Sequence, residues 1–144
     1  MRHFIFFVLA ICSINMFGQE WQTSYSEALS CAKDQNKPII LVFSGSDWCA
    51  PCIKLDKEIW QSTEFKSYSK ENYILYKADF PRKKSNKLAA SIERQNKSLA
   101  ESFNPKGYFP LVVVLSKNEK LHGQTAYKKI APDEYITHLN SFLK

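Results

Sequence analysis

Short apolar runs alternate along the chain with longer stretches in which apolar residues recur three and four positions apart. The short runs are rich in β-branched and aromatic residues, which predicts strands. They cover residues 39–43, 73–79 and 111–115, and a weaker strand is expected over 121–125. The longer stretches have the spacing of a single helix face and predict helices. They cover residues 24–35, 50–61, 62–70, 86–103 and the end of the chain from residue 131.

The order of these elements predicts an α/β fold. Helices separate the first three strands, so we expect parallel strands joined by helices, followed by a hairpin and a closing helix. The result is a mixed central β-sheet flanked by helices on both faces. In the helix over residues 86–103, the positions expected to face inward are Leu88, Ile92, Leu99 and Phe103.

The beginning of the chain has a different pattern from the rest. A basic start precedes the apolar run 4–11, and small and polar residues follow it, which is typical of a secretory signal peptide. The run is also shorter than the roughly 20 residues that span a bilayer. We therefore predict a signal peptide over 1–18, one domain over 19–144, and a periplasmic location. A lipid anchor at Cys12 is the alternative, although bulky Ile11 precedes that cysteine.

Charge and length narrow the possible functions. The 144 residues suit one domain and carry a formal charge of +6, which becomes +5 without residues 1–18. This surplus is modest and spread along the chain, which suits solubility and does not argue for binding to nucleic acid. We expect a monomer that binds no nucleic acid. The basic residues of segment 81–97 are the exception, and they suit either a partner site or a solvated helix face.

Two cysteines, separated by two residues, are predicted to carry the chemistry. Cys49 follows a strand and precedes the helix over 50–61, and Pro51 lies in the first turn, where its missing N–H is harmless. The thiolate is the nucleophilic form of cysteine, and a helix N-terminus lowers the pKa of a thiol placed there. We therefore expect an exposed Cys49 to attack client disulfides and a buried Cys52 to resolve the mixed disulfide.

Three other uses of the pair fit the sequence less well. A zinc site needs further ligands, but the other candidates are isolated in the sequence, namely Cys12, Cys31, His122 and His138. A c-type haem needs a histidine after Cys52, where Ile53 stands. A purely structural disulfide would close too short a loop to stabilise the fold much. We therefore expect no metal and no cofactor beyond the redox-active disulfide.

The surroundings of the cysteines resemble the active-site region of the thioredoxin superfamily. The motif is Trp48-Cys49-Ala50-Pro51-Cys52, between a buried strand and a helix. Phe109-Pro110, before the strand 111–115, is similar to the cis-proline loop of that family. The resemblance runs from Trp21 to Leu143 and is strongest to exported bacterial thioredoxin-like proteins. It implies a thioredoxin fold.

The resemblance also implies a role for each residue of the motif. Cys49 would be the nucleophile and Cys52 the resolving thiol. Trp48, Ala50 and Pro51 would contact the client beside the disulfide. Phe109-Pro110 would be a cis peptide bond that faces the disulfide and leaves the backbone of Phe109 free to pair with an extended client.

Three departures from the family pattern concern proton transfer and client choice. Thioredoxin has a buried acid in the strand before the active site, and Val42 stands at its place here. Asp47 is nearer, but an exposed carboxylate beside Cys49 is expected to oppose thiolate formation. Leu111 replaces the threonine that usually follows the cis-proline, and the connection over residues 80–98 is longer and more basic.

The function implied by the resemblance is that of a protein thiol–disulfide oxidoreductase. Pro51 before the second cysteine is the arrangement of reducing thioredoxins, which favours a disulfide reductase. Its partners would be disulfide-containing client proteins and a membrane-embedded thiol electron donor. Two alternatives stay open, namely a client-binding or adaptor module with little turnover, and a disulfide oxidant or isomerase.

Overall fold

The computed structural model describes residues 21–144, so the predicted signal peptide over 1–18 and Cys12 lie outside the described residues. The elements, in chain order, are α1 (Tyr25–Gln35), β1 (Ile39–Ser44), α2 (Ala50–Leu55), the π-helical turn η1 (Asp56–Trp60), α3 (Thr63–Asn72), β2 (Ile74–Asp79), the 3₁₀ turn η2 (Lys84–Asn86), α4 (Ala90–Phe103), β3 (Leu111–Leu115), β4 (Leu121–Thr125) and α5 (Pro132–Ser141). None of the described helices is both long and apolar enough to cross a bilayer.

The four strands form one mixed sheet in the order β2–β1–β3–β4. β1 and β2 are parallel, whereas β3 is antiparallel to both β1 and β4. The mixed sheet is as predicted, but the prediction that β3 runs parallel is wrong. β2 ends at Asp79 beside Ser44, and β3 begins at Leu111 beside Phe43. The connection that contains α4 therefore starts and ends at the same end of the sheet, and β3 must run back.

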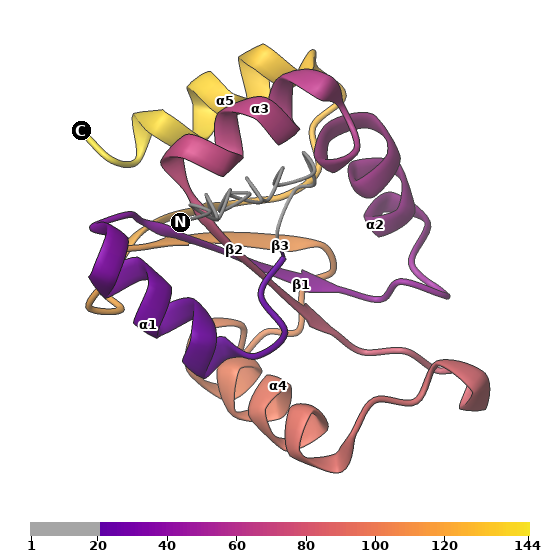
Figure 1. Cartoon of the computed structure of the whole chain (residues 1–144). Coiled ribbons are helices and arrows are strands. Elements are labelled where there is room, and N and C mark those ends of the chain that lie inside the picture. Colours follow the sequence, from indigo (N-terminus) through magenta and orange to yellow (C-terminus); the bar gives the residue numbers. More distant parts are fainter. Residues whose placement is uncertain (1–20) are drawn as a thin grey trace, which may run out of the picture.

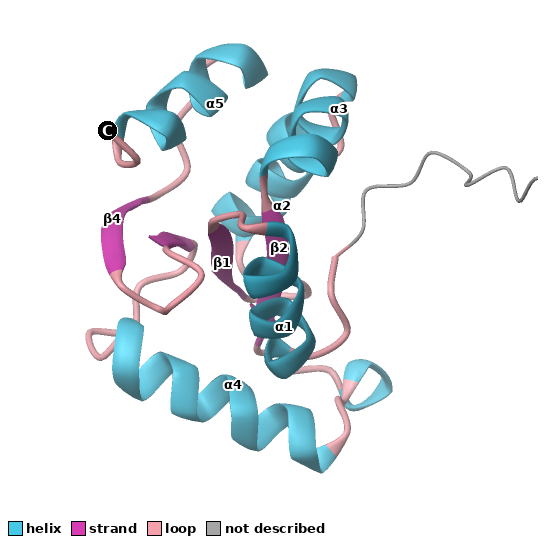
Figure 2. Ribbon diagram, turned by 60° about the vertical axis from the view of Figure 1, so that its left-hand side comes forward, coloured by secondary structure: helices cyan, strands magenta, loops and turns pink. Residues whose placement is uncertain are grey.

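Helices cover both faces of the sheet, as predicted. α1 and α4 lie on one face and α3 and α5 on the other (Figures 1 and 2). β1 is buried on both faces because its alternate side chains enter two separate cores. Ile39, Leu41 and Phe43 pack with residues of α1 and α4, whereas Ile40 and Val42 pack with residues of α2, η1, α3 and α5.

Two of the helices that flank the sheet have a serine as N-cap residue. Ser24 caps α1 by accepting a hydrogen bond from Glu27 N at 3.1 Å, and Ser62 caps α3 by accepting one from Phe65 N at 3.2 Å. Each cap satisfies a backbone N–H that has no partner within its helix. The Glu27 carboxylate accepts in turn from Thr23 N at 3.2 Å.

The helix predicted over residues 86–103 begins only at Ala90, so the prediction is wrong for its first turn. Asn86 lies in η2, and its side-chain amide donates to Asp47 Oδ2 at 3.0 Å. This long-range bond holds the chain in a loop before the helix starts. Of the four positions expected to face inward, Leu99 is buried, while Leu88, Ile92 and Phe103 are half-buried.

The helix predicted over residues 50–61 is divided in two. α2 ends at Leu55, and the chain continues as the π-helical turn η1. Gln61 N donates to Asp56 O at 2.9 Å, which is the wider i to i+5 bond of a π turn. Such turns are frequent at functional sites, and this one begins four residues after Cys52.

Candidate active site

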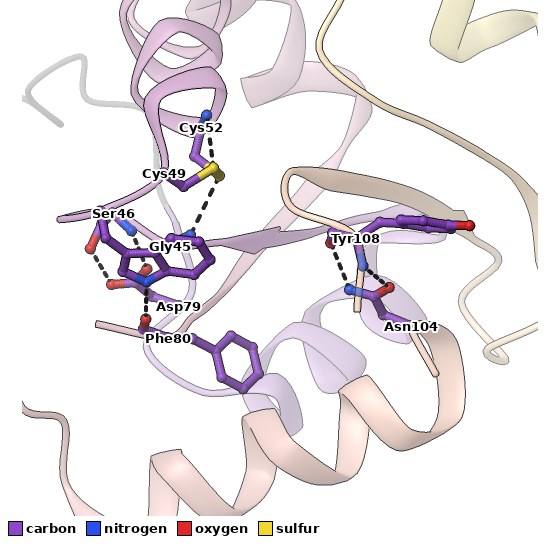
Figure 3. Close-up of a disulfide and its surroundings, with 9 residues drawn as sticks. Gly45, Ser46, Cys49, Cys52, Asp79, Phe80, Asn104 and Tyr108 are labelled. Atoms are coloured by element: carbon purple, nitrogen blue, oxygen red, sulfur yellow. Dashed lines mark hydrogen bonds between the residues drawn. A yellow bond between two sulfur atoms is a disulfide. The ribbon is translucent and has the colours of Figure 1, made fainter. Parts of the chain in front are cut away.

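The two cysteines of the motif form a disulfide at the start of α2 (Figure 3). Cys49 is the N-cap residue of the helix, and its Sγ accepts a hydrogen bond from Cys52 N at 3.3 Å. The Sγ of Cys52 accepts from Gly45 N at 3.5 Å. Pro51 lies in the first turn, as predicted. Each sulfur therefore faces a backbone N–H, and this contact also stabilises a thiolate.

Both cysteines are buried in the disulfide form. Cys49 is 5% exposed and Cys52 is 3% exposed, so the prediction of an exposed Cys49 is wrong for this form. The chain before Cys49 makes a closed turn in which Cys49 N donates to Gly45 O at 2.9 Å. This turn places Gly45 N at the Cys52 sulfur. Ala50 and Pro51, between the cysteines, are exposed and form the accessible surface of the motif.

Three aromatic side chains, Trp48, Phe80 and Phe109, form a cluster beside the disulfide. The ring centroids of Trp48 and Phe80 lie 5.4 and 5.5 Å from that of Phe109. The indole Nε1 of Trp48 donates to Phe80 O at 2.7 Å. A Cβ atom on Gly45 would lie 2.2 Å from the Trp48 ring, so glycine is required for this packing. We call residues 45–49 the active-site turn and residues 104–110 the proline loop. The aromatic cluster packs these two segments against each other.

Asp47 binds segment 80–86 to the active-site turn. Its carboxylate accepts hydrogen bonds from Arg82 N at 2.9 Å, from Lys83 N at 3.0 Å and from the Asn86 amide. These donors, the Arg82 N–H foremost, lower the pKa of Asp47 below its ordinary value. Both oxygens of Asp47 are engaged by this segment, and the lowered pKa keeps the carboxylate charged, so its opposition to a Cys49 thiolate stays a prediction.

Basic side chains begin at the rim of the active site. The Arg82 guanidinium lies 3.8 Å from the centroid of the Trp48 ring, which is a cation–π contact. Lys83, Lys84 and Lys87 are exposed in the same loop. The basic segment noted in the sequence thus starts beside the disulfide and continues along α4.

Asn104 shapes the proline loop. The Phe109–Pro110 peptide bond is cis, as the resemblance implied. Just before it, Asn104 Oδ1 accepts from Tyr108 N at 2.9 Å and Asn104 Nδ2 donates to Tyr108 O at 2.8 Å (Figure 3). Asn104 is buried, and sequence reasoning missed it. The available signal was an asparagine at a helix end followed at once by Pro105.

Ser46 and Asp79 attach the active-site turn to the end of β2. Ser46 N and Oγ both donate to the Asp79 carboxylate, the first at 2.9 Å (Figure 3). Asn96 on α4 donates to Asp79 O at 3.1 Å and accepts from the Tyr76 hydroxyl at 2.6 Å. Sequence reasoning missed this network because its members are far apart in the chain. It fixes the strand end on which the active-site turn rests.

A cavity of about 170 Å³ lies beside Cys52. Its lining residues are Ser44, Ser46, Cys52, Ile53, Asp56 and Lys77. Lys77 Nζ and Asp56 Oδ1 form an ion pair at 2.9 Å across it. Val42, at the place of the buried acid of thioredoxin, lies next to Lys77 in the strand register. The acid in this region therefore comes from η1 and not from β1.

Two described residues, Cys31 and His138, lie apart from the disulfide in sequence. The half-buried Cys31 thiol lies 3.6 Å from Gln22 Oε1. His138 bonds Thr125 Oγ1 at 2.9 Å, and burial together with the charge of Lys128 lowers the pKa of His138. Within the described part of the chain, no group of three cysteine, histidine or acidic residues could hold a metal ion.

Comparisons with known proteins agree with this geometry. A family model described as thioredoxin-like matches residues 20–117. The disulfide bond reductase DsbH of Chlamydia pneumoniae is 34% identical over 125 residues, covering 87% of this chain and 73% of that protein. The thioredoxin-related protein DsbJ of the same organism is 31% identical over 100 residues, covering 69% of this chain and 28% of that protein.

A solved structure has the same fold over most of the chain. The DsbH oxidoreductase superposes with a TM-score of 0.81 and 32% identity, covering 88% of this chain and 85% of that one. This confirms the predicted thioredoxin fold. The family match spans β1, both cysteines and the cis-proline loop. The chain belongs to the thioredoxin-like family.

Proposed function

We propose that this chain is a disulfide reductase for exported proteins. The observation that carries the proposal is the Cys49–Cys52 disulfide at the N-terminus of α2, with a backbone N–H directed at each sulfur. A relative that covers 87% of the chain is named a disulfide bond reductase, which supports the direction of electron flow. An oxidant would run the same exchange in reverse.

The reaction begins from the reduced dithiol. The Cys49 thiolate, favoured by its position at a helix N-terminus, attacks a client disulfide and expels one client sulfur as a thiolate. Cys52 then attacks the sulfur of Cys49 in the mixed disulfide, which expels the second client sulfur and forms the Cys49–Cys52 disulfide. Two electrons pass from the protein dithiol to the client in each cycle.

Client contact is assigned to the surface around the disulfide. Ala50 and Pro51 are exposed directly between the cysteines. Trp48 and Phe109 are half-buried in the aromatic cluster, so each offers part of a ring to an approaching chain. The backbone of Phe109, next to Pro110, would pair with an extended client segment, as in the family.

We place the reaction outside the cytoplasm. The supporting observations are the signal-peptide pattern of residues 1–18 and the match to a relative named a disulfide bond reductase. Each turnover leaves the cysteine pair oxidised, so a thiol donor must reduce it again. For an exported protein these electrons have to cross the membrane, so a membrane-embedded thiol–disulfide protein is the class of donor that fits.

The reductase activity is tested by reduction of insulin with dithiothreitol as electron source. We expect the protein to accelerate precipitation of the insulin B chain, and we expect Cys49→Ser to abolish the acceleration. Thermal unfolding of the variant serves as the control for folding. A folded wild-type protein that binds a client peptide without accelerating its reduction would contradict the proposal and favour the adaptor function.

A further inference from the structure

The resolving thiol must lose its proton before it attacks, and β1 offers no acid beside it. We propose that Asp56 takes the proton from Cys52, with Lys77 holding the Asp56 carboxylate in place. This inference rests on the proposed reductase function and concerns the second half of its cycle. It assigns the task to the residues that line the cavity beside Cys52.

Lys77 projects to the face of the sheet that carries α2. Leu75, two residues earlier on β2, belongs to the core on that face, and residues two apart in a strand share a face. Lys77 Nζ also lies 4.8 Å from the ring centroid of Trp21, which packs against the same core. Val42 is the register partner of Lys77 on β1. The ammonium group therefore occupies the face where Val42 lacks an acid.

Asp56 lies one helical turn beyond Cys52. Its backbone N–H donates to Cys52 O, and side chains four apart in a helix share a face. One carboxylate oxygen pairs with Lys77 Nζ at 2.9 Å, and the other lies 3.4 Å from Gln61 Nε2. The π-helical turn begins at Asp56 itself. The π-helical turn and the ion pair with Lys77 thus both hold the Asp56 carboxylate at the cavity.

The surroundings allow proton transfer between the two groups. The cavity holds about 170 Å³, and one water molecule takes roughly 30 Å³, so water can connect the thiol to the carboxylate. Lys77 is 28% exposed and Asp56 is 38% exposed, so a proton accepted by Asp56 can leave to solvent. Asp56 can thus receive a proton from the thiol through water and then release it to solvent. Both are needed because the step is repeated in every cycle.

Two other acids, Asp79 and Glu58, are not among the residues that line the cavity. Asp79, also on β2, accepts hydrogen bonds at both oxygens from Ser46. Glu58, on η1, accepts from the Tyr127 hydroxyl. Among the lining residues the titratable groups are Cys52 from α2, Asp56 from η1 and Lys77 from β2. The carboxylate that shares the cavity lining with the thiol is that of Asp56, so we assign it as the acceptor.

The step can be written in full. The Cys52 S–H bond breaks and its proton goes to the Asp56 carboxylate, directly or through water. The Cys52 thiolate forms a bond to the sulfur of Cys49, and the bond between Cys49 and the client sulfur breaks. The client sulfur leaves with the electron pair and takes up a proton. The protein dithiol is oxidised by two electrons, and the client disulfide is reduced.

Reduced protein that carries Cys31→Ser, which removes the half-buried free thiol, is mixed with a slight excess of 5,5′-dithiobis(2-nitrobenzoate) to separate the two halves of the cycle. The attack of Cys49 releases one coloured thiolate, and the attack of Cys52 releases the second at a rate independent of reagent concentration. We expect Asp56→Asn to slow only the second release, by about a hundredfold or more at pH 7. The deficit should disappear at high pH, where solvent removes the proton. Asp56→Glu should restore most of the rate.

Control variants and the pH dependence of the second release test whether Asp56 acts as the proton acceptor. Asp34→Asn, an exposed acid on α1, should leave both releases unchanged, and Lys77→Met should slow the second less than Asp56→Asn does. A second release that is unchanged in Asp56→Asn, or slowed equally at every pH, would overturn the inference and leave the reductase function standing. If the wild-type protein showed no first release from Cys49, the proposed function itself would fail.

Discussion

The two sulfurs of one short motif lie against different surroundings. On the side of Cys49, Asp47, the aromatic cluster and segment 80–86 form a partly exposed rim with cationic side chains. On the side of Cys52, a small cavity holds the ion pair of Asp56 and Lys77. We call these the client side and the proton side. The helix start already makes the two thiols unequal, and the packing around the motif gives each of them different neighbours as well.

The largest change in activity should come from removing either cysteine, because Cys49 attacks the client and Cys52 resolves the mixed disulfide. Cys52→Ser can still be attacked through Cys49 but cannot resolve, so it should accumulate a mixed disulfide with a client. Cys49→Ser should accumulate almost none. Non-reducing gel electrophoresis and mass spectrometry after incubation with a disulfide-bonded client measure both. Equal trapping by the two variants would break the division between the sides.

Gly45 lies between the two sides, so its replacement should disturb both. In Gly45→Ala, the new Cβ would meet the Trp48 ring, and Gly45 N is the donor to Cys52 Sγ. We expect the free energy of unfolding to fall by about 1–3 kcal/mol, the usual cost of overpacking. Denaturant unfolding followed by tryptophan fluorescence measures it. Ser67→Ala, at an exposed position on α3, is the control, and an equal loss there would contradict the account.

Asp47→Asn should loosen the client side alone. Because N–H donors lower the pKa of Asp47, its bonds stabilise the loop above the ordinary carboxyl pKa and are lost as the pH falls below about 4. We expect Asp47→Asn to speed amide hydrogen exchange at Arg82 and Lys83 at neutral pH. Exchange in α2 should stay slow. Unchanged exchange at both amides would mean that Asp47 does not hold the segment.

The smallest effect concerns His138, which belongs to neither side. Burial and the charge of Lys128 lower its pKa in the folded state, so the folded protein binds the proton less readily than the unfolded chain. Stability should therefore decline as the pH falls below about 6.5. His138→Gln should flatten that decline without changing the insulin reduction rate. Unfolding midpoints from pH 7 to 5 measure it, and an unchanged slope would contradict this assignment.

The sequence predicted what depends on neighbours along the chain. The strand β1 follows from five consecutive apolar residues, and the start of α2 follows from Cys49 and Pro51. The resemblance supplied the cis bond at Phe109–Pro110. These features are local or belong to a motif, so they can be read without the tertiary structure.

What the sequence did not predict depends on contacts between distant residues. The late start of α4 reflects the bond from Asn86 to Asp47, 39 positions apart. The ion pair of Lys77 and Asp56 spans 21 positions, and it forms only when β2 lies under the helix. The exposure of Cys49 was also predicted wrongly, since the residue is 5% exposed in the packed chain. The client side and the proton side are therefore products of packing.

The equilibrium redox potential of the Cys49–Cys52 pair tests the central claim most directly. It is measured in the mature protein against dithiothreitol or glutathione buffers. For a two-electron couple, about 30 mV corresponds to roughly 1.4 kcal/mol, so the two directions of exchange are well separated. A reductase should give a value near that of thioredoxin, about −270 mV. A value near about −120 mV would identify an oxidant and contradict the account.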